Sequence, residues 1–367
     1  MIEITNTNNT ALVFSDSIDS GAEGLLKALC ASPAAQGCQI RIMPDVHAGK
    51  GCAVGTTMTL GDYVMPGLVG VDIGCGILAC KVGRRRPELG KLDKLIKERV
   101  PAGRSIRQKT HQLAEQTGLE QLRCLRHVQQ AKALRSIGSL GGGNHFIELD
   151  KDAQGNFWLL IHSGSRHLGV EVAEYYQEAA FRQSAPGTAY ELAYASGGLL
   201  ENYLWDMAIA QRFAALNRRA IADEICRGMK FNCQEQIDTI HNYIDMERRI
   251  LRKGAVSAQA GELLVIPLNM RDGCLLCRGK GNPEWNFSAP HGAGRLLSRS
   301  EARQSFTLTQ YKQEMRGIFS TSISRGTIDE SPMAYKPMAS ILAQIEPTVE
   351  VMGRWQTVYN FKAGGEG

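Results

Sequence analysis

Polar motifs flanked by glycines are spread over almost the entire chain, and this spread constrains the fold more than any other feature. The first lies around Asp45, and the last lies around Lys362. No internal repeat, low-complexity segment or Pro/Gly/Ser-rich linker interrupts the sequence between them. Residues so far apart can form one site only if the intervening segments fold together. We therefore predict a single α/β domain over residues 1–367, in which helices surround mixed β-sheets.

The amino-acid composition is that of a globular protein. Hydrophobic residues make up 43% of the chain and charged residues 22%, which argues against general disorder. No stretch approaches the ~20 apolar residues that span a bilayer, so no membrane partner is expected. The N-terminus has neither the basic nor the apolar segment of an export signal, which predicts a cytoplasmic location. The net charge of +5 permits a nucleic-acid partner without requiring one.

Hydrophobic periodicity predicts the secondary structure in outline. The clearest helix has Ile209, Phe213 and Leu216 on one face. Gly228 follows this apolar face as a stop signal. The predicted elements are, in order, short strands and tight turns over 1–80, a charged helical segment over 87–136, strands over 146–149 and 158–161, a helix over 201–228, strands and loops from 263, and a charged helix over 299–314.

Five residues have the side chains of metal ligands and lie in short polar segments. His145, His162 and His241 each stand at the end of an apolar run, where scaffolds present functional side chains. Each of these histidines alone would more often be a hydrogen-bonded structural residue. Asp72 and Cys75, three positions apart among glycines, add a carboxylate and a thiol. Such a set suits zinc, iron or manganese, and a thiolate can bridge two ions that assist phosphoryl transfer. The spacing alone leaves the metal and the reaction open.

His291 is a candidate nucleophile. It lies between small residues in Ala-Pro-His-Gly-Ala-Gly-Arg, with the guanidinium of Arg295 four positions later. Imidazole can attack phosphorus covalently, and guanidinium can neutralise phosphate charge. A histidine in a turn before a helix is an equally good interpretation of the motif alone. The glycine-rich segment 278–283 is a weak candidate for a phosphate-binding loop. His111 and His127 lie in a charged segment and are expected at the surface.

The ten cysteines do not suggest a disulfide framework. Cys80 and Cys226 lie in apolar patterns typical of small core residues. Cys274 and Cys277 form one C-x-x-C motif, but a structural zinc site normally has four ligands, so a zinc or redox role is the weaker interpretation. Basic pairs and triplets are most simply solvated, although each could contact RNA. They lie at 84–86, 218–219, 248–249 and 252–253.

Taken together, nine motifs resemble the RtcB family of RNA-splicing ligases and follow that family's order along the chain. Chance explains one such string but not nine. The matching segments are 43–47, 70–76, 141–148, 162–169, 241–243, 252–255, 278–283, 289–295 and 332–336.

The resemblance implies the family's own α/β fold and an RNA ligase that depends on GTP and manganese. Such an enzyme joins an RNA 3′-phosphate, or a 2′,3′-cyclic phosphate after opening, to a 5′-hydroxyl end. By this likeness His291 attacks the α-phosphate of GTP, GMP passes to the RNA 3′-phosphate, and the 5′-hydroxyl displaces it. A role in RNA repair and a possible accessory activating protein are implied in the same way. The implied ligands of two Mn²⁺ ions, with Cys75 bridging, are Asp72, Cys75, His145, His162 and His241.

The resemblance also assigns residues to the nucleotide and to RNA. Asp45 matches an acidic position that acts through its neighbours. The residues implied to contact RNA phosphates are Arg166, Arg295 and Arg299. Those implied to contact the nucleotide are Asn144, Glu148, Asn269, Cys274, His291, Ala293, Gly294, Tyr335 and Lys362.

The sequence departs from the family pattern in one loop. Asn269 and Cys274 stand where two serines are expected near the nucleotide, and Arg271 replaces a glycine. An amide still hydrogen-bonds well, whereas a thiol does so poorly. These changes predict altered guanine affinity or substrate choice, and they suggest a divergent branch specialised for one cleaved RNA.

Two other functions compete with an RNA ligase. A metal-dependent phosphohydrolase or nuclease would use the same metal ligands without needing His291 or Lys362. A non-catalytic RNA-binding relative would be expected to lose the metal ligands first, and all five are present.

Overall fold

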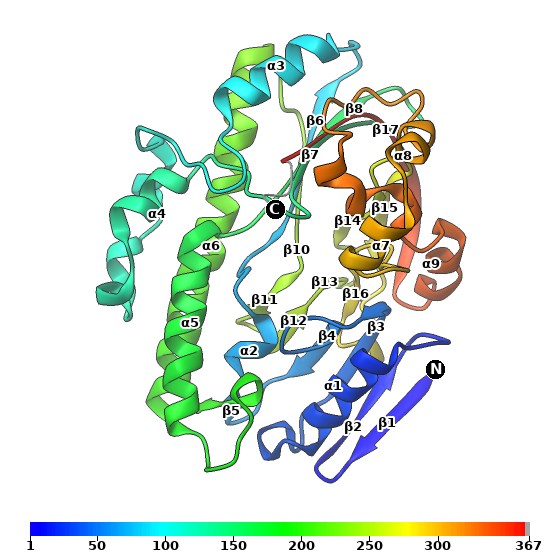
Figure 1. Ribbon diagram of the computed structural model, residues 1–367. Coiled ribbons are helices and arrows are strands. Elements are labelled where there is room, and N and C mark those ends of the chain that lie inside the picture. The colour runs from blue at the N-terminus through cyan, green and yellow to red at the C-terminus, as the bar shows by residue number, and fades with distance from the viewer. Residues whose placement is uncertain (364–367) are drawn as a thin grey trace.

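Two β-sheets form the framework of the computed structural model, which describes residues 1–363 (Figure 1). The smaller sheet has the strand order β1 (Ile2–Asn6), β2 (Asn9–Val13), β3 (Ile40–His47), β4 (Val54–Thr59), β12 (Ile250–Lys253) and β11 (Asn242–Asp245). The larger has the order β10 (Gln236–Ile240), β6 (Gly76–Gly83), β8 (Phe157–Ser163), β7 (Phe146–Lys151), β17 (Val349–Lys362), β15 (Gly273–Gly279) and β14 (Leu263–Asn269). Strands β2 and β3 pair in parallel, and the other pairs within both sheets are antiparallel.

Helices cover these sheets and complete an α/β fold with mixed sheets, as predicted. The long helices α5 (Arg166–Gln183) and α6 (Gly197–Met229) lie side by side along one flank (Figure 1). The remaining α-helices are α1 (Ser20–Ala31), α2 (Pro66–Val69), α3 (Leu89–Arg99), α4 (Gln130–Ser136), α7 (Arg299–Ser305), α8 (Leu308–Glu314) and α9 (Met338–Ile345). Short strand pairs join β5 (Tyr63–Val64) to β9 (Ala195–Ser196) and β13 (Ala255–Ser257) to β16 (Ser288–Pro290).

The helix predicted over 201–228 is present as α6, but other helix predictions need correction. The segment predicted as one helix over 299–314 forms two, because Ser298 and Thr307 each begin a helix with a capping box. Within the segment predicted as strands and turns, α1 begins at an N-cap, Asp19, whose side chain accepts a hydrogen bond from the amide of Ala22. The segment 87–136 contains α3 and α4 separated by 3₁₀ turns. His111 is buried as the N-cap of one such turn and is not a surface residue.

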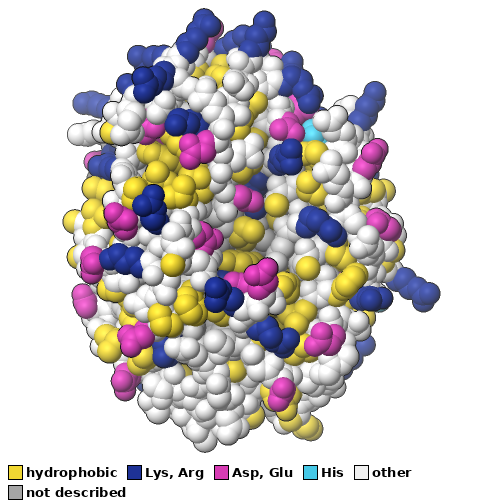
Figure 2. Space-filling model, turned by 180° about the vertical axis from the view of Figure 1, so that it is seen from behind, with side chains coloured by type: hydrophobic (Ala, Val, Ile, Leu, Met, Phe, Trp, Pro, Cys, Tyr) yellow, Lys and Arg dark blue, Asp and Glu magenta, His cyan; other side chains and the backbone are white. Residues whose placement is uncertain are grey.

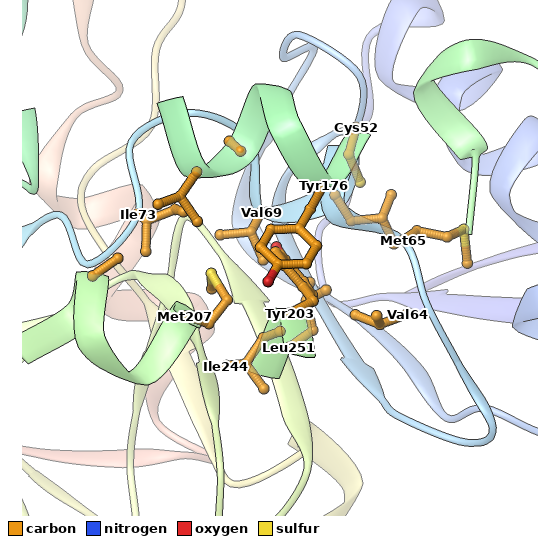
Figure 3. Close-up of a cluster of buried hydrophobic side chains, with 14 of the residues drawn as sticks. Cys52, Val64, Met65, Val69, Ile73, Tyr176, Tyr203, Met207, Ile244 and Leu251 are labelled. Atoms are coloured by element: carbon orange, nitrogen blue, oxygen red, sulfur yellow. The ribbon is translucent and has the colours of Figure 1, made fainter. Parts of the chain in front are cut away.

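The largest hydrophobic cluster lies between the two long helices and the smaller sheet. Tyr176 of α5 and Tyr203 of α6 pack there with Leu251 of β12 (Figure 3). A second cluster joins α3 and α6 to the larger sheet and contains Cys80, a core residue as predicted. Burial of these side chains stabilises the fold by about 25 cal/mol for each Å² of apolar surface removed from water. Within residues 1–363, no helix is long and apolar enough to cross a membrane.

The antiparallel register brings chain segments far apart in sequence to one edge of the larger sheet. Gly76 at the start of β6 pairs with Ser163 at the end of β8. Phe146 at the start of β7 pairs with His162 on one side and with Lys362 on the other. Since strand starts and strand ends alternate in an antiparallel sheet, the residues that precede β6 and β7 lie beside those that end β8 and β17.

Arg218 of α6 connects three of the segments that meet at this edge. Its guanidinium pairs with both carboxylate oxygens of Asp238 at 2.9 Å and donates to the carbonyls of Gly74 and Ser163 at 2.7 and 3.0 Å. Because Arg218 is fully buried, Arg218→Met leaves unpaired carbonyls and should lower the free energy of unfolding by about 2–4 kcal/mol. Urea denaturation measures this loss.

The matched control for that experiment is Arg182→Met, which removes an exposed arginine paired with Glu178 on α5. Exposed ion pairs contribute little, so we expect a loss below about 1 kcal/mol. Equal losses of unfolding free energy in the two variants would show that the buried Arg218 stabilises the fold no more than an exposed arginine does.

Candidate metal and nucleotide site

The five predicted metal ligands converge at the shared edge of the larger sheet. Asp72 and Cys75 precede β6, His145 precedes β7, His162 lies in β8, and His241 links β10 to β11. Backbone hydrogen bonds join these loops. The amide of His241 donates to the carbonyl of Cys75 at 2.9 Å.

Gly74 is required where this loop passes α6. Its φ of 71° lies in the left-handed region, and a Cβ there would meet the Cβ of Ala214 at 2.8 Å. The amide of Gly74 donates to the carbonyl of Asn242 at 2.7 Å. The glycine therefore lets the loop that carries Cys75 pack directly against the helix.

Cys75 is the centre of the cluster. Its Sγ lies 3.4 Å from Nε2 of His145 and 3.2 Å from Nε2 of His162. Nε2 of His162 lies 3.3 Å from Nε2 of His241, and Nε2 of His145 lies 3.4 Å from a carboxylate oxygen of Asp72. The donor atoms form two groups, each within 4.8 Å, one of Cys75, His162 and His241 and the other of Asp72, Cys75 and His145. The cysteine belongs to both groups, an arrangement that a bridging thiolate would need.

The chemistry of these donors fits metal ions. Burial lowers the pKa of His162 and of His241 well below the ordinary value, so both imidazoles are neutral with a lone pair to offer. Burial raises the pKa of the Cys75 thiol, which therefore needs a cation beside it to ionise. Nδ1 of His145 is buried without a hydrogen-bond partner among residues 1–363. Three imidazoles, a thiol and a carboxylate around one point are ligands for a transition-metal ion.

His291 lies next to this cluster and is held by Asp45. The imidazole rings of His291 and His241 are 5.0 Å apart. Nδ1 of His291 lies 2.7 Å from a carboxylate oxygen of Asp45, and the same oxygen accepts the backbone amide of His291 at 3.2 Å. The Asp45 side chain is fully buried, whereas that of His291 is 21% exposed. This arrangement directs Nε2 of His291 away from Asp45.

A cavity of about 800 Å³ opens beside His291 and is of a size that holds a nucleotide. Gly294, with a φ of 74°, lets the wall approach Asp45, because a Cβ there would lie 3.0 Å from the Asp45 backbone. Most of the predicted nucleotide contacts line this cavity. They are Asn144, Glu148, Asn269, His291, Ala293, Gly294, Tyr335 and Lys362.

Cys274 is the exception among the predicted nucleotide contacts. It is fully buried and does not line the cavity, and its thiol donates to Asp150 at 3.2 Å. Asp150 and Glu148 lie on the same face of β7, and burial raises the pKa of both carboxyl groups. Cys274 thus touches a residue beneath the cavity wall. Cys277, three positions along the same strand, packs in a different hydrophobic cluster, so the C-x-x-C pair does not form one zinc site.

Two of the three arginines predicted to contact RNA line the cavity, namely Arg295 and Arg299. Arg166 does not line the cavity. Its guanidinium donates to the hydroxyl of Ser139 at 3.2 Å and to the carbonyl of Gly103 at 2.6 Å. Arg166 also has a φ of 57°, a strained conformation for a residue with a side chain.

Two other arginines, Arg252 and Arg271, do not line the cavity. Arg252 is fully buried and bonds to the hydroxyls of Ser288 and Tyr243 at 2.8 and 2.9 Å. Arg271, in the divergent loop, forms ion pairs with Asp272 and Glu314. The candidate phosphate-binding loop 278–283 does not line the cavity. Figure 2 shows one face of the molecule, on which Lys and Arg are interspersed with Asp and Glu rather than gathered into one basic patch.

Two acidic residues of the site were missed in the sequence. Asp329 and Glu330 end the 3₁₀ helix η7 (Arg325–Glu330), and each is about 2% exposed. Glu330 faces Lys362 and Asp329 faces Arg299. The only signal was their position directly before the motif at 332–336, because an acidic pair is ordinary on a protein surface.

The fold and the site together define an α/β protein with a buried metal-binding cluster beside a nucleotide-sized cavity. A family model described as tRNA-splicing ligase RtcB matches residues 28–363. The chain therefore belongs to the RtcB family, which confirms the resemblance carried by its nine motifs.

Similar proteins share most of their length with this chain. The RNA-splicing ligase RtcB of Escherichia coli (strain K12) is 32% identical over 358 residues, covering 85% of this chain and 87% of that protein. The RNA-splicing ligase RtcB2 of another Escherichia coli strain is 30% identical over 328 residues, covering 82% and 81%. The tRNA-splicing ligase RtcB of Aeropyrum pernix is 26% identical over 407 residues, covering 84% of each. The similarity thus extends across the fold and is not confined to the site.

Proposed function

We propose that the protein is an RNA ligase that uses GTP and two Mn²⁺ ions to join an RNA 3′-phosphate, or an opened 2′,3′-cyclic phosphate, to a 5′-hydroxyl end. Family membership supports the class of reaction. The observation that carries the finer proposal is the position of His291, which lines the cavity together with the candidate ligands His162 and His241 and is bonded to Asp45. A hydrolase using the same metal ligands would need no histidine held in this way.

Asp45 determines which nitrogen of His291 reacts. In the tautomer whose Nδ1–H donates to the Asp45 carboxylate, Nε2 has a free lone pair. Nε2 then attacks the α-phosphorus of GTP, a nitrogen–phosphorus bond forms, and the bond to pyrophosphate breaks. An oxygen of the RNA 3′-phosphate attacks the same phosphorus, which releases the imidazole and leaves GMP joined to the RNA end. The 5′-hydroxyl finally attacks the RNA phosphorus and GMP departs with the bonding electrons.

Residues of the cavity wall would hold the substrates during these steps. Lys362 and Tyr335 lie in the wall, where they would contact the nucleotide, and the guanidinium groups of Arg295 and Arg299 can neutralise phosphate charge. Asp72, Cys75, His145, His162 and His241 would hold the two ions. When bound, the ions would offset the negative charge that gathers on phosphate oxygens during transfer.

The proposal is tested with labelled GTP. Incubation of the protein with α-³²P-GTP and Mn²⁺ should leave an acid-labile label on the protein and release pyrophosphate. Addition of oligonucleotides ending in 3′-phosphate and 5′-hydroxyl should then remove the label and yield a joined product. Release of free phosphate or cleaved RNA without any labelled protein would support a metal-dependent phosphohydrolase or nuclease instead.

Other aspects of the function rest on the sequence alone. A role in RNA repair, a preference for one cleaved RNA, a stimulatory accessory protein and a cytoplasmic location all stay predictions. Ligation assays with several broken RNAs test the preference, and equal rates on all of them would contradict it.

A further inference from the structure

Glu330 lines a second cavity and contacts residues that line the nucleotide cavity. Tyr335, Lys362 and Arg299 line the nucleotide cavity. The second cavity, of about 450 Å³, is lined by Glu330 together with Arg299 and Arg303. Arg299 therefore belongs to both cavities, and the Glu330 carboxylate is positioned to act on groups in each.

The two oxygens of this carboxylate face different groups. Oε2 lies 2.5 Å from the amino group of Lys362 and accepts a hydrogen bond from the hydroxyl of Tyr335 at 2.8 Å. Oε1 lies 2.7 Å from the guanidinium of Arg299 and 3.5 Å from that of Arg295. One oxygen thus holds Lys362 and Tyr335, and the other holds the two arginines.

The charge on Glu330 is stable in this setting. Burial disfavours the ionised form, but Lys362, Arg299 and Arg295 together hold the pKa of Glu330 at about 2. The carboxylate is therefore a fixed anion at neutral pH. A lysine side chain is a flexible chain with a point charge, so a fixed anion beside its amino group removes freedom that would otherwise be lost when ligand binds.

We propose that Glu330 is a positioning residue that fixes Lys362 and Tyr335 for recognition of the nucleotide base and Arg299 for phosphate groups. This inference rests on the proposed function and deepens it. An ammonium group only donates hydrogen bonds, so a fixed Lys362 favours a base edge with an acceptor oxygen, as in guanine, over one with an amino group, as in adenine. Glu330 therefore contributes to the choice of GTP over ATP without touching the reacting atoms.

The test measures protein guanylylation in single-turnover reactions at varied GTP and ATP concentrations. Glu330→Gln keeps the size of the side chain and removes its charge. We expect the half-saturating GTP concentration to rise about tenfold, the preference for GTP over ATP to fall about tenfold, and the maximal rate to change less than about threefold. Glu330→Asp should restore part of the affinity. In a double variant with Lys362→Met, the two effects should not multiply, because one residue acts through the other.

The matched control is Glu224→Gln. Glu224 lies near the C-terminal end of α6 and is also largely buried. Its carboxylate is 3.4 Å from Arg107 and 3.6 Å from Arg227. Glu224→Gln should leave GTP affinity and nucleotide preference unchanged. The comparison therefore distinguishes a general effect of losing a buried carboxylate from the loss of a residue that positions Lys362 and Tyr335.

The outcomes separate this inference from the proposed function. If the wild-type protein takes no label from GTP, the proposed function fails and the inference fails with it. If the wild type is labelled but Glu330→Gln has the same GTP affinity and the same preference for GTP, only the positioning role is overturned. If Glu330→Gln does not fold, as judged by thermal melting, Glu330→Asp decides, and wild-type affinity and preference in that variant would also overturn the role.

Discussion

His291→Ala should abolish labelling of the protein by GTP and lower the rate of RNA joining by at least about a thousandfold. The reason is chemical, because the His291 imidazole is bonded to the Asp45 carboxylate and lies at the wall of the cavity. Binding of GTP should weaken far less, since the remaining wall residues are intact. Acid-labile label per protein molecule and joined product measure the reaction, and equilibrium binding of GTP measures the affinity.

The control for this experiment is His127→Ala. His127 is exposed, packs against Tyr175 of α5 and does not line the cavity. It should keep wild-type labelling and joining. Retained label in His291→Ala would show that another residue is the nucleophile and would remove the main support for a GMP–histidine intermediate.

The second large effect is expected from Cys75→Ala. Because Cys75 belongs to both groups of donor atoms, its loss should weaken binding at both metal positions rather than at one. We expect Mn²⁺ affinity to fall at least about a hundredfold and guanylylation to be lost with it. Calorimetric titration with Mn²⁺ and elemental analysis of the protein provide direct readouts that do not depend on activity.

Cys233→Ala is the matched control, because this partly exposed thiol lies outside both donor groups. It should bind Mn²⁺ as the wild type does. His145→Ala and His241→Ala each remove a donor from only one group, so each should weaken one position more than the other. Unchanged stoichiometry and affinity in Cys75→Ala would contradict the bridging arrangement.

The sequence revealed more of the chemistry than of the geometry. His145, His162 and His241 stood out because each lies in a short polar segment at one end of an apolar run, a local pattern that strand and loop propensities explain. Their convergence could not be derived locally. It depends on the pairing of β6 with β8 and of β8 with β7, which joins residues more than 80 positions apart in the case of Gly76 and Ser163.

Errors in the secondary structure have local causes. The helix expected over 299–314 is divided because Thr307 accepts the amide of Gln310 and begins a new helix, a stronger local signal than the charged pattern that spans both. α1 was missed although Asp19 is a good N-cap, because Gly21 and Gly24 weaken the helical pattern.

The nucleotide pocket shows where residue type was a poor guide. Cys274 was assigned to the nucleotide from its motif position, but on β15 its side chain points to the buried face shared with Trp355. The sequence predicted that Arg271 adds a positive charge beside the site. In the structure its guanidinium instead forms ion pairs with Asp272 and Glu314. Strand alternation and nearby counter-ions therefore placed both side chains elsewhere.

The amino-acid sequence alone was sufficient for the family, the α/β class and the kinds of side chain available for metal and phosphate chemistry, because these follow from motifs and composition. Which of those side chains meet depended on sheet register and burial. Glu330 illustrates the difference. In the sequence it is one of 37 acidic residues, and in the folded chain it is a buried anion that contacts Lys362, Tyr335 and Arg299. Long-range packing, which no local pattern encodes, gave it those neighbours.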